Sequence, residues 1–84
     1  MKLWIGNIAP GTTDATLREF VKKYAHELEC TTLQRVEGDG SRPAAILTFA
    51  GSDLMAVPRL ALRLDGMYWQ ERKLSCAAEP SLTA

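Results

Sequence analysis

The six residues from Leu3 to Ile8, Leu-Trp-Ile-Gly-Asn-Ile, constrain the fold of this chain more than any other stretch. Two aliphatic side chains alternate with Trp4, which is the pattern of a strand with two different faces. Gly6 and Asn7 carry turn chemistry, so we expect the strand to end there. A tryptophan opposite two aliphatic residues is either covered by another part of the molecule or presented to a partner.

The stretch from Thr12 to about His26 has the periodicity of a helix. Thr12, Thr13 or Asp14 can cap its beginning. The apolar side chains repeat at i, i+3, i+4 and i+7 and therefore share one face. The residues of this face are Leu17, Phe20, Val21 and Tyr24.

Two strands are predicted next, over residues 28–37 and 42–49, joined by the hairpin turn 38–41. Alternation gives the second of these strands two faces. We expect the core face to hold Ala45, Leu47 and Phe49, and the opposite face to hold Arg42, Ala44, Ile46 and Thr48.

A second helix is predicted over residues 51–64. Pro58 lies inside this range, where it removes the bond to the carbonyl of Leu54 and should kink the first turns. The helix is also apolar over a wide arc, because Met55, Pro58 and Leu62 extend its core stripe. Either flanking segments cover these three residues, or they form a protein contact.

The chain should end with a short irregular or strand-like piece over 67–70 and a last strand over 72–78, with Leu74 and Cys76 facing inward. Residues 80–84 contain Pro80 and are expected to form a flexible tail. The domain is therefore placed at 1–79.

This order of elements predicts an α+β fold, a ferredoxin-like βαββαβ sandwich. Right-handed crossovers place both helices on one face of a four-stranded antiparallel sheet. The other face has no second layer, and Trp4 is expected on that open face.

With this layout, the chain resembles the RNA recognition motif (RRM) family. The hexapeptide at residues 3–8 is similar to the first-strand motif of the family, and 42–49 takes the place of its third-strand octapeptide. Leu64-Asp65-Gly66 and Arg72-Lys73-Leu74 resemble the end of its second helix and its last strand. The resemblance implies strand order 4-1-3-2, which puts Cys30 and Cys76 on opposite edges, too far apart for a disulfide.

The third-strand motif is degenerate on its ligand-facing side. The family pattern has glycine at position 43 and aromatic residues at 44 and 46, where this chain has Pro43, Ala44 and Ile46. In the family, bases stack on such aromatic side chains. The resemblance therefore implies that Trp4 is the one stacking platform that is kept.

Our first hypothesis is that the open sheet face binds single-stranded RNA, with Trp4 stacking on a base. Cations would contact phosphates, polar side chains would bond base edges, and Asn7 would either shape the adjoining loop or touch the RNA. The predicted RNA-binding residues are Lys2, Trp4, Asn7, Thr32, Gln34, Arg42, Ala44, Ile46, Lys73 and Ser75. The formal net charge is zero, which disfavours binding driven by phosphate charge alone.

The alternative hypothesis is a protein-interaction or self-associating module that uses Met55, Pro58 and Leu62 or the sheet face. The zero net charge and the missing aromatic residues favour this alternative. Catalysis is not expected, because the single histidine, His26, has no identifiable partners for a catalytic site, and no metal or cofactor is expected. With no signal peptide or membrane-spanning run visible, an intracellular protein, cytoplasmic or nuclear, is expected.

Overall fold

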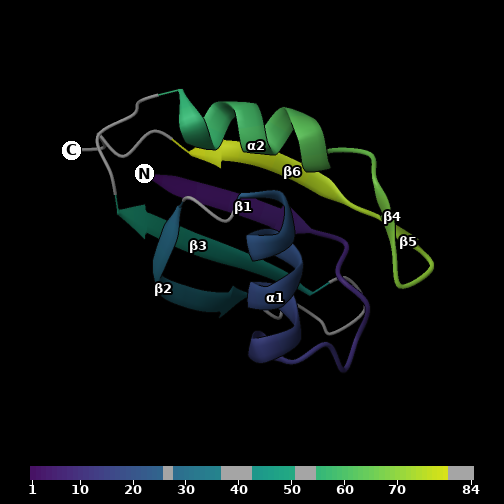
Figure 1. The fold of residues 1–84 in the computed structure, drawn as a ribbon. Helices are drawn as coiled ribbons and strands as arrows, with labels where there is room; N and C mark the ends of the chain where they lie inside the picture. Colours follow the sequence, from purple (N-terminus) through teal and green to yellow (C-terminus); the bar gives the residue numbers. More distant parts are fainter. Residues whose placement is uncertain (26–27, 37–42, 51–54, 80–84) are drawn as a thin grey trace.

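A computed structural model describes residues 1–25, 28–36, 43–50 and 55–79. Figure 1 shows the arrangement of its helices and strands. The elements are β1 (Lys2–Gly6), α1 (Asp14–Tyr24), β2 (Glu29–Val36), β3 (Ala44–Ala50), α2 (Ala56–Leu64), β4 (Tyr68–Trp69), β5 (Arg72–Lys73) and β6 (Ser75–Glu79). The predicted turn at 38–41, the tail at 80–84, Arg42 and His26 lie outside the described residues.

The four long strands form one antiparallel sheet in the order β2-β3-β1-β6. With β6 as the fourth strand, this is the predicted order 4-1-3-2, so the predicted fold class is confirmed. Cys30 lies on β2 and Cys76 on β6, the two edges of the sheet. Three strand spacings of about 4.8 Å separate these edges, which a disulfide cannot span.

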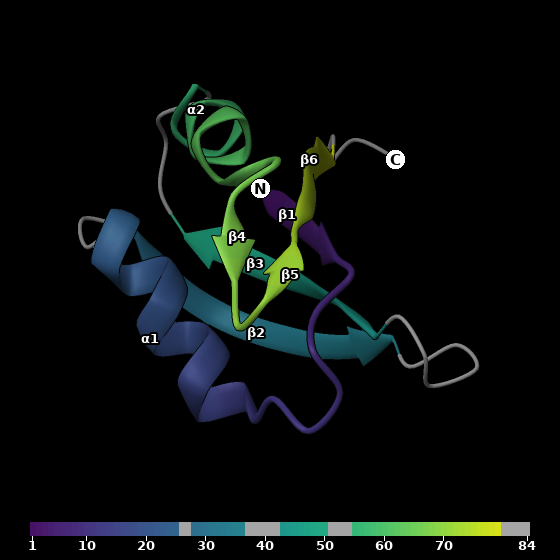
Figure 2. The same cartoon turned by 90° about the vertical axis from the view of Figure 1, so that its right-hand side faces the viewer.

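Both helices pack on the same face of the sheet, and the two views in Figures 1 and 2 show this layering. One cluster of buried side chains joins β1 and β3 to α1 and α2. The predicted inward residues of β3 are all buried, and Leu74 and Cys76 are also buried as predicted. The fully buried members of the core include Leu3, Ile5, Leu17, Leu47 and Leu64. Neither described helix is long and apolar enough to cross a membrane.

Helix α1 begins where its sequence supplies a cap. Thr13 has extended backbone geometry, and its hydroxyl accepts a 3.2 Å hydrogen bond from the backbone N–H of Thr16. Asp14 follows in the first turn, where its negative charge interacts favourably with the positive end of the helix dipole. The helix ends at Tyr24, two residues earlier than predicted.

Pro58 lies in the first turn of helix α2, not in its interior as predicted. The helix begins at Ala56, so Pro58 occupies its third position. The N–H groups of a first turn have no partner within the helix, so proline costs no internal hydrogen bond at this position. The predicted start at 51–53 and the carbonyl of Leu54 lie outside the described residues.

The first strand ends where the sequence predicted. Gly6 is the last residue of β1, and Asn7 adopts a left-handed backbone with φ 60°. The predicted last strand is split, because residues 72–73 pair with β4 in a separate hairpin and β6 begins at Ser75. Figure 2 shows this small hairpin lying in front of the main sheet.

Candidate functional site

The open face of the sheet is centred on Trp4. The register aligns Trp4 with Ile46 on β3 and with Ala77 on β6, and aligns Ile46 with Gln34 on β2. One row of side chains therefore crosses all four strands. Trp4 and Ile46 are half-buried, whereas Gln34 and Ala77 are exposed. The small Ala77 was not predicted as a site residue, because only the register shows that it borders the indole.

The other predicted polar residues lie around this row. Thr32 pairs with Thr48 at one end of the face, and Ser75 pairs with Gly6 at the other. Thr32 and Ser75 are exposed. Ala44 is placed differently from our expectation, because only 6% of it is exposed. It therefore offers almost no surface for a ligand to touch.

Of the two described cations that were predicted to bind phosphate, only Lys2 lies on the open face. Lys2 is directly opposite Glu79, so its charge has an acidic neighbour on the adjoining strand. Lys73 belongs to the β4–β5 hairpin and pairs with Tyr68. Among the described strands of the main sheet, the open face is close to neutral. Its chemistry is aromatic, aliphatic and amide, which suits bases better than phosphates.

Asn7 shapes the loop that follows β1. Its Nδ2 donates a 2.9 Å hydrogen bond to the carbonyl of Lys73, and its Oδ1 accepts a 3.0 Å bond from Arg72. Both ends of the side-chain amide are therefore occupied by the β4–β5 hairpin. Of the two roles considered for Asn7, the structure supports the loop-shaping one.

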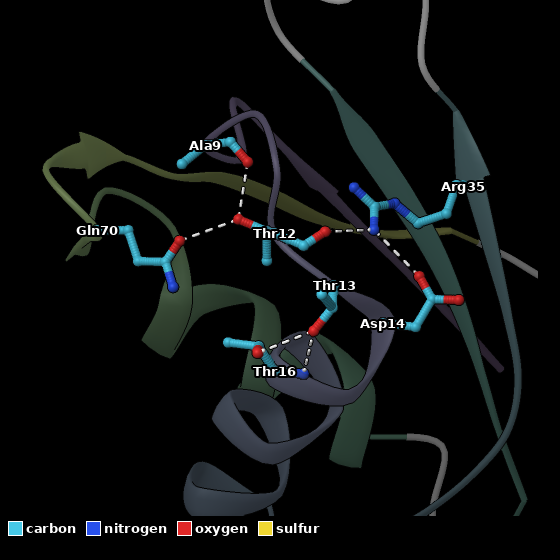
Figure 3. Close-up of polar contacts among 7 residues, drawn as sticks. All are labelled: Ala9, Thr12, Thr13, Asp14, Thr16, Arg35 and Gln70. Atoms are coloured by element: carbon cyan, nitrogen blue, oxygen red, sulfur yellow. Dashed lines mark hydrogen bonds and ion pairs between the residues drawn. The ribbon is translucent and has the colours of Figure 1, made fainter.

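A second clamp joins the loop after β1 to the same hairpin. The buried Thr12 Oγ1 lies 2.7 Å from the carbonyl oxygen of Ala9 and 2.9 Å from the side-chain amide of Gln70 (Figure 3). The Thr12 hydroxyl therefore lies within hydrogen-bonding distance of two acceptors, the carbonyl of Ala9 and Oε1 of Gln70, and donates its single proton between them.

Arg35 holds the beginning of α1 against β2. One guanidinium nitrogen donates to the carbonyl of Thr12 at 2.9 Å and lies 3.0 Å from the carboxylate of Asp14 (Figure 3). The side chain of Arg35 is 20% exposed, so it lies largely under the loop. Sequence reasoning missed this contact. Because Gln34 and Val36 face outward, strand alternation places the side chain of Arg35 on the inner face, and this was the available signal.

The predicted protein-contact strip on α2 is exposed at both of its ends. Met55 is 56% exposed and Leu62 is 81% exposed, with the partly buried Pro58 between them. Within the described residues, no element packs over Leu62.

An aromatic cluster, not predicted from the sequence, joins α1 to the β4–β5 hairpin. Trp69 stacks on Phe20 with ring centroids 4.3 Å apart and an interplanar angle of 20°. Tyr24 meets Phe20 edge-on at 5.4 Å. The neighbouring Tyr68 is 73% exposed. This cluster fixes the hairpin on the helix-bearing side of the sheet and leaves one ring accessible there.

Cys76 is a buried thiol beside a carboxylate. Desolvation, with a smaller contribution from the charge of Asp65, raises the pKa of Cys76 to about 12 from an ordinary value of 9.0. The backbone N–H of Cys76 donates a 2.9 Å hydrogen bond to Asp65 Oδ1. A thiol with such a high pKa is a poor nucleophile at neutral pH, so its role is in packing.

Comparisons with known proteins agree with this geometry. A family model described as the RNA recognition motif matches residues 3–75. A solved structure of the three N-terminal RNA-binding domains of the yeast splicing factor Prp24 matches with a TM-score of 0.76 at 17% identity. That match covers 98% of this chain and 34% of the other, so the chain spans about a third of it. A search of curated proteins found no match.

Proposed function

The chain belongs to the RNA recognition motif family, and from this premise we propose that it binds single-stranded RNA through the open face of its sheet. Trp4 is the platform on which a base stacks. Ile46 and Ala77 flank it, and Gln34 lies at the end of the same row, paired with Ile46 on the neighbouring strand. The exposed Thr32 and Ser75 supply further polar groups at the two ends of the face.

The position of Trp4 carries this proposal. It lies on a central strand, on the face opposite both helices, and is only half-buried. A tryptophan placed only for stability would be expected in the core, as its neighbours Leu3 and Ile5 are. Stacking of a base on such a ring contributes about 1–3 kcal/mol and tolerates different bases.

The experiment is an NMR titration with a randomised short single-stranded RNA. We expect shifts of the Trp4 indole N–H and of the amides of Ile46 and Ala77. Replacing Trp4 by alanine should weaken binding about 5- to 150-fold, which corresponds to the loss of one stacked base. Trp4→Phe keeps an aromatic ring and should recover part of that loss.

One control variant makes the outcome decisive. Trp69→Phe changes the other tryptophan, which stacks on Phe20 away from the open face, and should leave RNA affinity unchanged. A titration with no shifts on β1 and β3, or equal affinities for the Trp4→Ala variant and the natural chain, would refute the stacking role.

A second candidate function is contact with a protein, or with a second copy of the chain, through α2. The observation that favours it is the 81% exposure of Leu62 together with the 56% exposure of Met55. Sedimentation at increasing concentration tests self-association. Leu62→Ser should then abolish any dimer, whereas Arg63→Ser on the same helix should have a smaller effect. A monomer at all concentrations would remove self-association from consideration.

A further inference from the structure

We propose that Gly6 is a positioning residue for the stacking surface. Because glycine has no side chain, the Trp4 indole can lie directly over Gly6, and we call this space over Gly6 the seat. The seat sets the orientation in which the ring meets a base. The inference rests on the proposed function and extends it to a residue that itself offers no side chain to a ligand.

The contact between the two residues is close. Gly6 follows Trp4 by two positions, so both belong to the open face. A Cβ atom on Gly6 would lie 2.6 Å from Cζ2 of Trp4 and 3.0 Å from Cζ3, and nearer still to Cη2 between them. Real Cβ atoms essentially never come closer than 3.0 Å to a heavy atom of a residue that is not their chain neighbour. The far rim of the indole therefore occupies the space that any other residue at position 6 would fill.

The backbone does not account for glycine at this position. Gly11 and Gly66 have positive φ angles of 89° and 82°, where glycine is favoured, but Gly6 does not belong to that group. Alanine would fit the strand conformation of Gly6, and glycine inside a strand is destabilising relative to alanine. Contact with the ring is thus the structural reason for a glycine.

The seat determines what Trp4 presents to a ligand. Side chains on a strand lean along its direction, and here the indole leans over Gly6. Gly6 is buried although it lies on the open face, and the three heavy atoms nearest to a Cβ built on it all belong to this ring. A methyl group at position 6 would push the rim of the ring away from β1. Aromatic stacking depends on the offset and tilt of the two rings, so the displaced indole would stack less well.

The geometry is tested first without ligand, by NMR of the full chain. A proton beneath an indole is shielded, so the Gly6 Hα resonances should lie upfield and return to ordinary positions in Trp4→Ala. Gly6→Ala should move the Trp4 indole N–H resonance. Gly11→Ala is the control for backbone strain without ring contact, because its φ of 89° opposes a side chain but no heavy atom lies within 4 Å of a Cβ at that site. It should leave the indole resonance unchanged.

The function of the seat is tested by a double-mutant cycle with short single-stranded RNA. Gly6→Ala should weaken binding about fivefold or more in the natural chain, and should have no effect in Trp4→Ala, which has no ring to displace. Thermal melts of all four proteins establish that each is folded at the temperature of the titration.

The outcomes separate the two proposals. If Gly6→Ala moves the indole but leaves RNA affinity unchanged while Trp4→Ala weakens it, the positioning role is refuted and RNA binding stands. If the Gly6 Hα resonances do not respond to Trp4→Ala, the seat is absent and the inference is refuted. If Trp4→Ala does not weaken RNA binding, the stacking role itself fails. An affinity loss with Gly6→Ala that disappears in Trp4→Ala supports both.

Discussion

At the scale of single residues, burial separates side chains that stabilise the fold from those available to a ligand. Leu47 and Trp4 lie on adjacent central strands but on opposite faces of the sheet. Leu47 is fully buried, whereas Trp4 is half-buried. The alternation of apolar residues predicted this division, because successive side chains of a strand point to opposite faces.

Replacing these two residues by alanine should therefore have opposite effects. Leu47→Ala should lower the free energy of unfolding by about 2–5 kcal/mol, because it leaves a cavity in the core. Trp4→Ala should cost less than about 3 kcal/mol, below the usual cost of removing a buried aromatic ring. Urea titrations measure both. A larger loss for Trp4→Ala than for Leu47→Ala would place the indole in the core.

Other residues could not be assigned from the sequence because their roles depend on distant partners. Gly6 was correctly predicted to end the strand, but its contact with the ring of Trp4 could not be predicted from the sequence. Asn7 and Thr12 bond groups on the β4–β5 hairpin, more than fifty positions away. Lys73 was expected beside the open face, but the split of the last strand moves it onto that hairpin.

At the scale of elements, the β4–β5 hairpin turns on unusual residues. Gln70 and Glu71 both have positive φ, 55° and 66°, although neither is a glycine or an asparagine. Two-residue hairpin turns with this geometry usually have asparagine or glycine. This is why the hairpin was predicted only as a short irregular piece. The clamp from Gln70 to Thr12 and the stack of Trp69 on Phe20 offset the cost of the turn.

Glycine at position 71 should relieve part of this strain. Glu71→Gly is expected to raise the free energy of unfolding by up to about 1 kcal/mol, since glycine has no Cβ atom to clash with the backbone in the left-handed conformation. For a domain of this size, that is a rise of about 4–8 °C in melting temperature. Glu71→Ala removes the charge and keeps the Cβ, so it should give no such gain. Equal melting temperatures for the two variants would show that the turn is not strained.

At the scale of the whole molecule, the predicted topology is confirmed because it depends on strong local patterns and a general rule. Two amphipathic helices and four alternating strands were visible in the chain, and the handedness of crossovers fixes which face the helices cover. The strand order came from the family resemblance and is the one observed. Element ends were less accurate, as the boundaries of α1 and α2 show.

The whole domain should lose stability at high pH because of Cys76. Below about pH 9 its thiol is protonated in both folded and unfolded chains and adds no pH dependence. Above pH 9 the unfolded thiol ionises, whereas burial keeps the folded one protonated up to a pKa of about 12. The unfolded chain then binds fewer protons, so stability falls as pH rises, by at most about 1.4 kcal/mol per pH unit.

Urea midpoints from about pH 8 to about pH 11 measure this effect. Cys76→Ala should show a shallower decline than the natural chain. Cys30→Ala keeps Cys76 and should follow the natural chain. Identical curves for all three proteins would mean that Cys76 does not contribute to alkaline destabilisation.

The charge distribution of the molecule predicts weak salt dependence of RNA binding. The chain has no net charge, and Lys2 on the open face lies opposite Glu79. If all three predicted cations, Lys2, Arg42 and Lys73, bound phosphates, the logarithm of affinity would fall with the logarithm of salt at a slope near −2. We expect a shallower slope in titrations at several KCl concentrations. A steeper slope would show that phosphate contacts dominate.

The pairing of Lys2 with Glu79 brings the first and last strands of the fold together at one corner of the sheet. A peptide that joined β6 back to β1 would turn the chain into a ring without crossing the open face or the helices. Circularisation restricts the unfolded chain much more than the folded one, because the folded ends are already neighbours. The domain is therefore well suited to head-to-tail cyclisation, and its ring form should melt at a higher temperature than the linear chain.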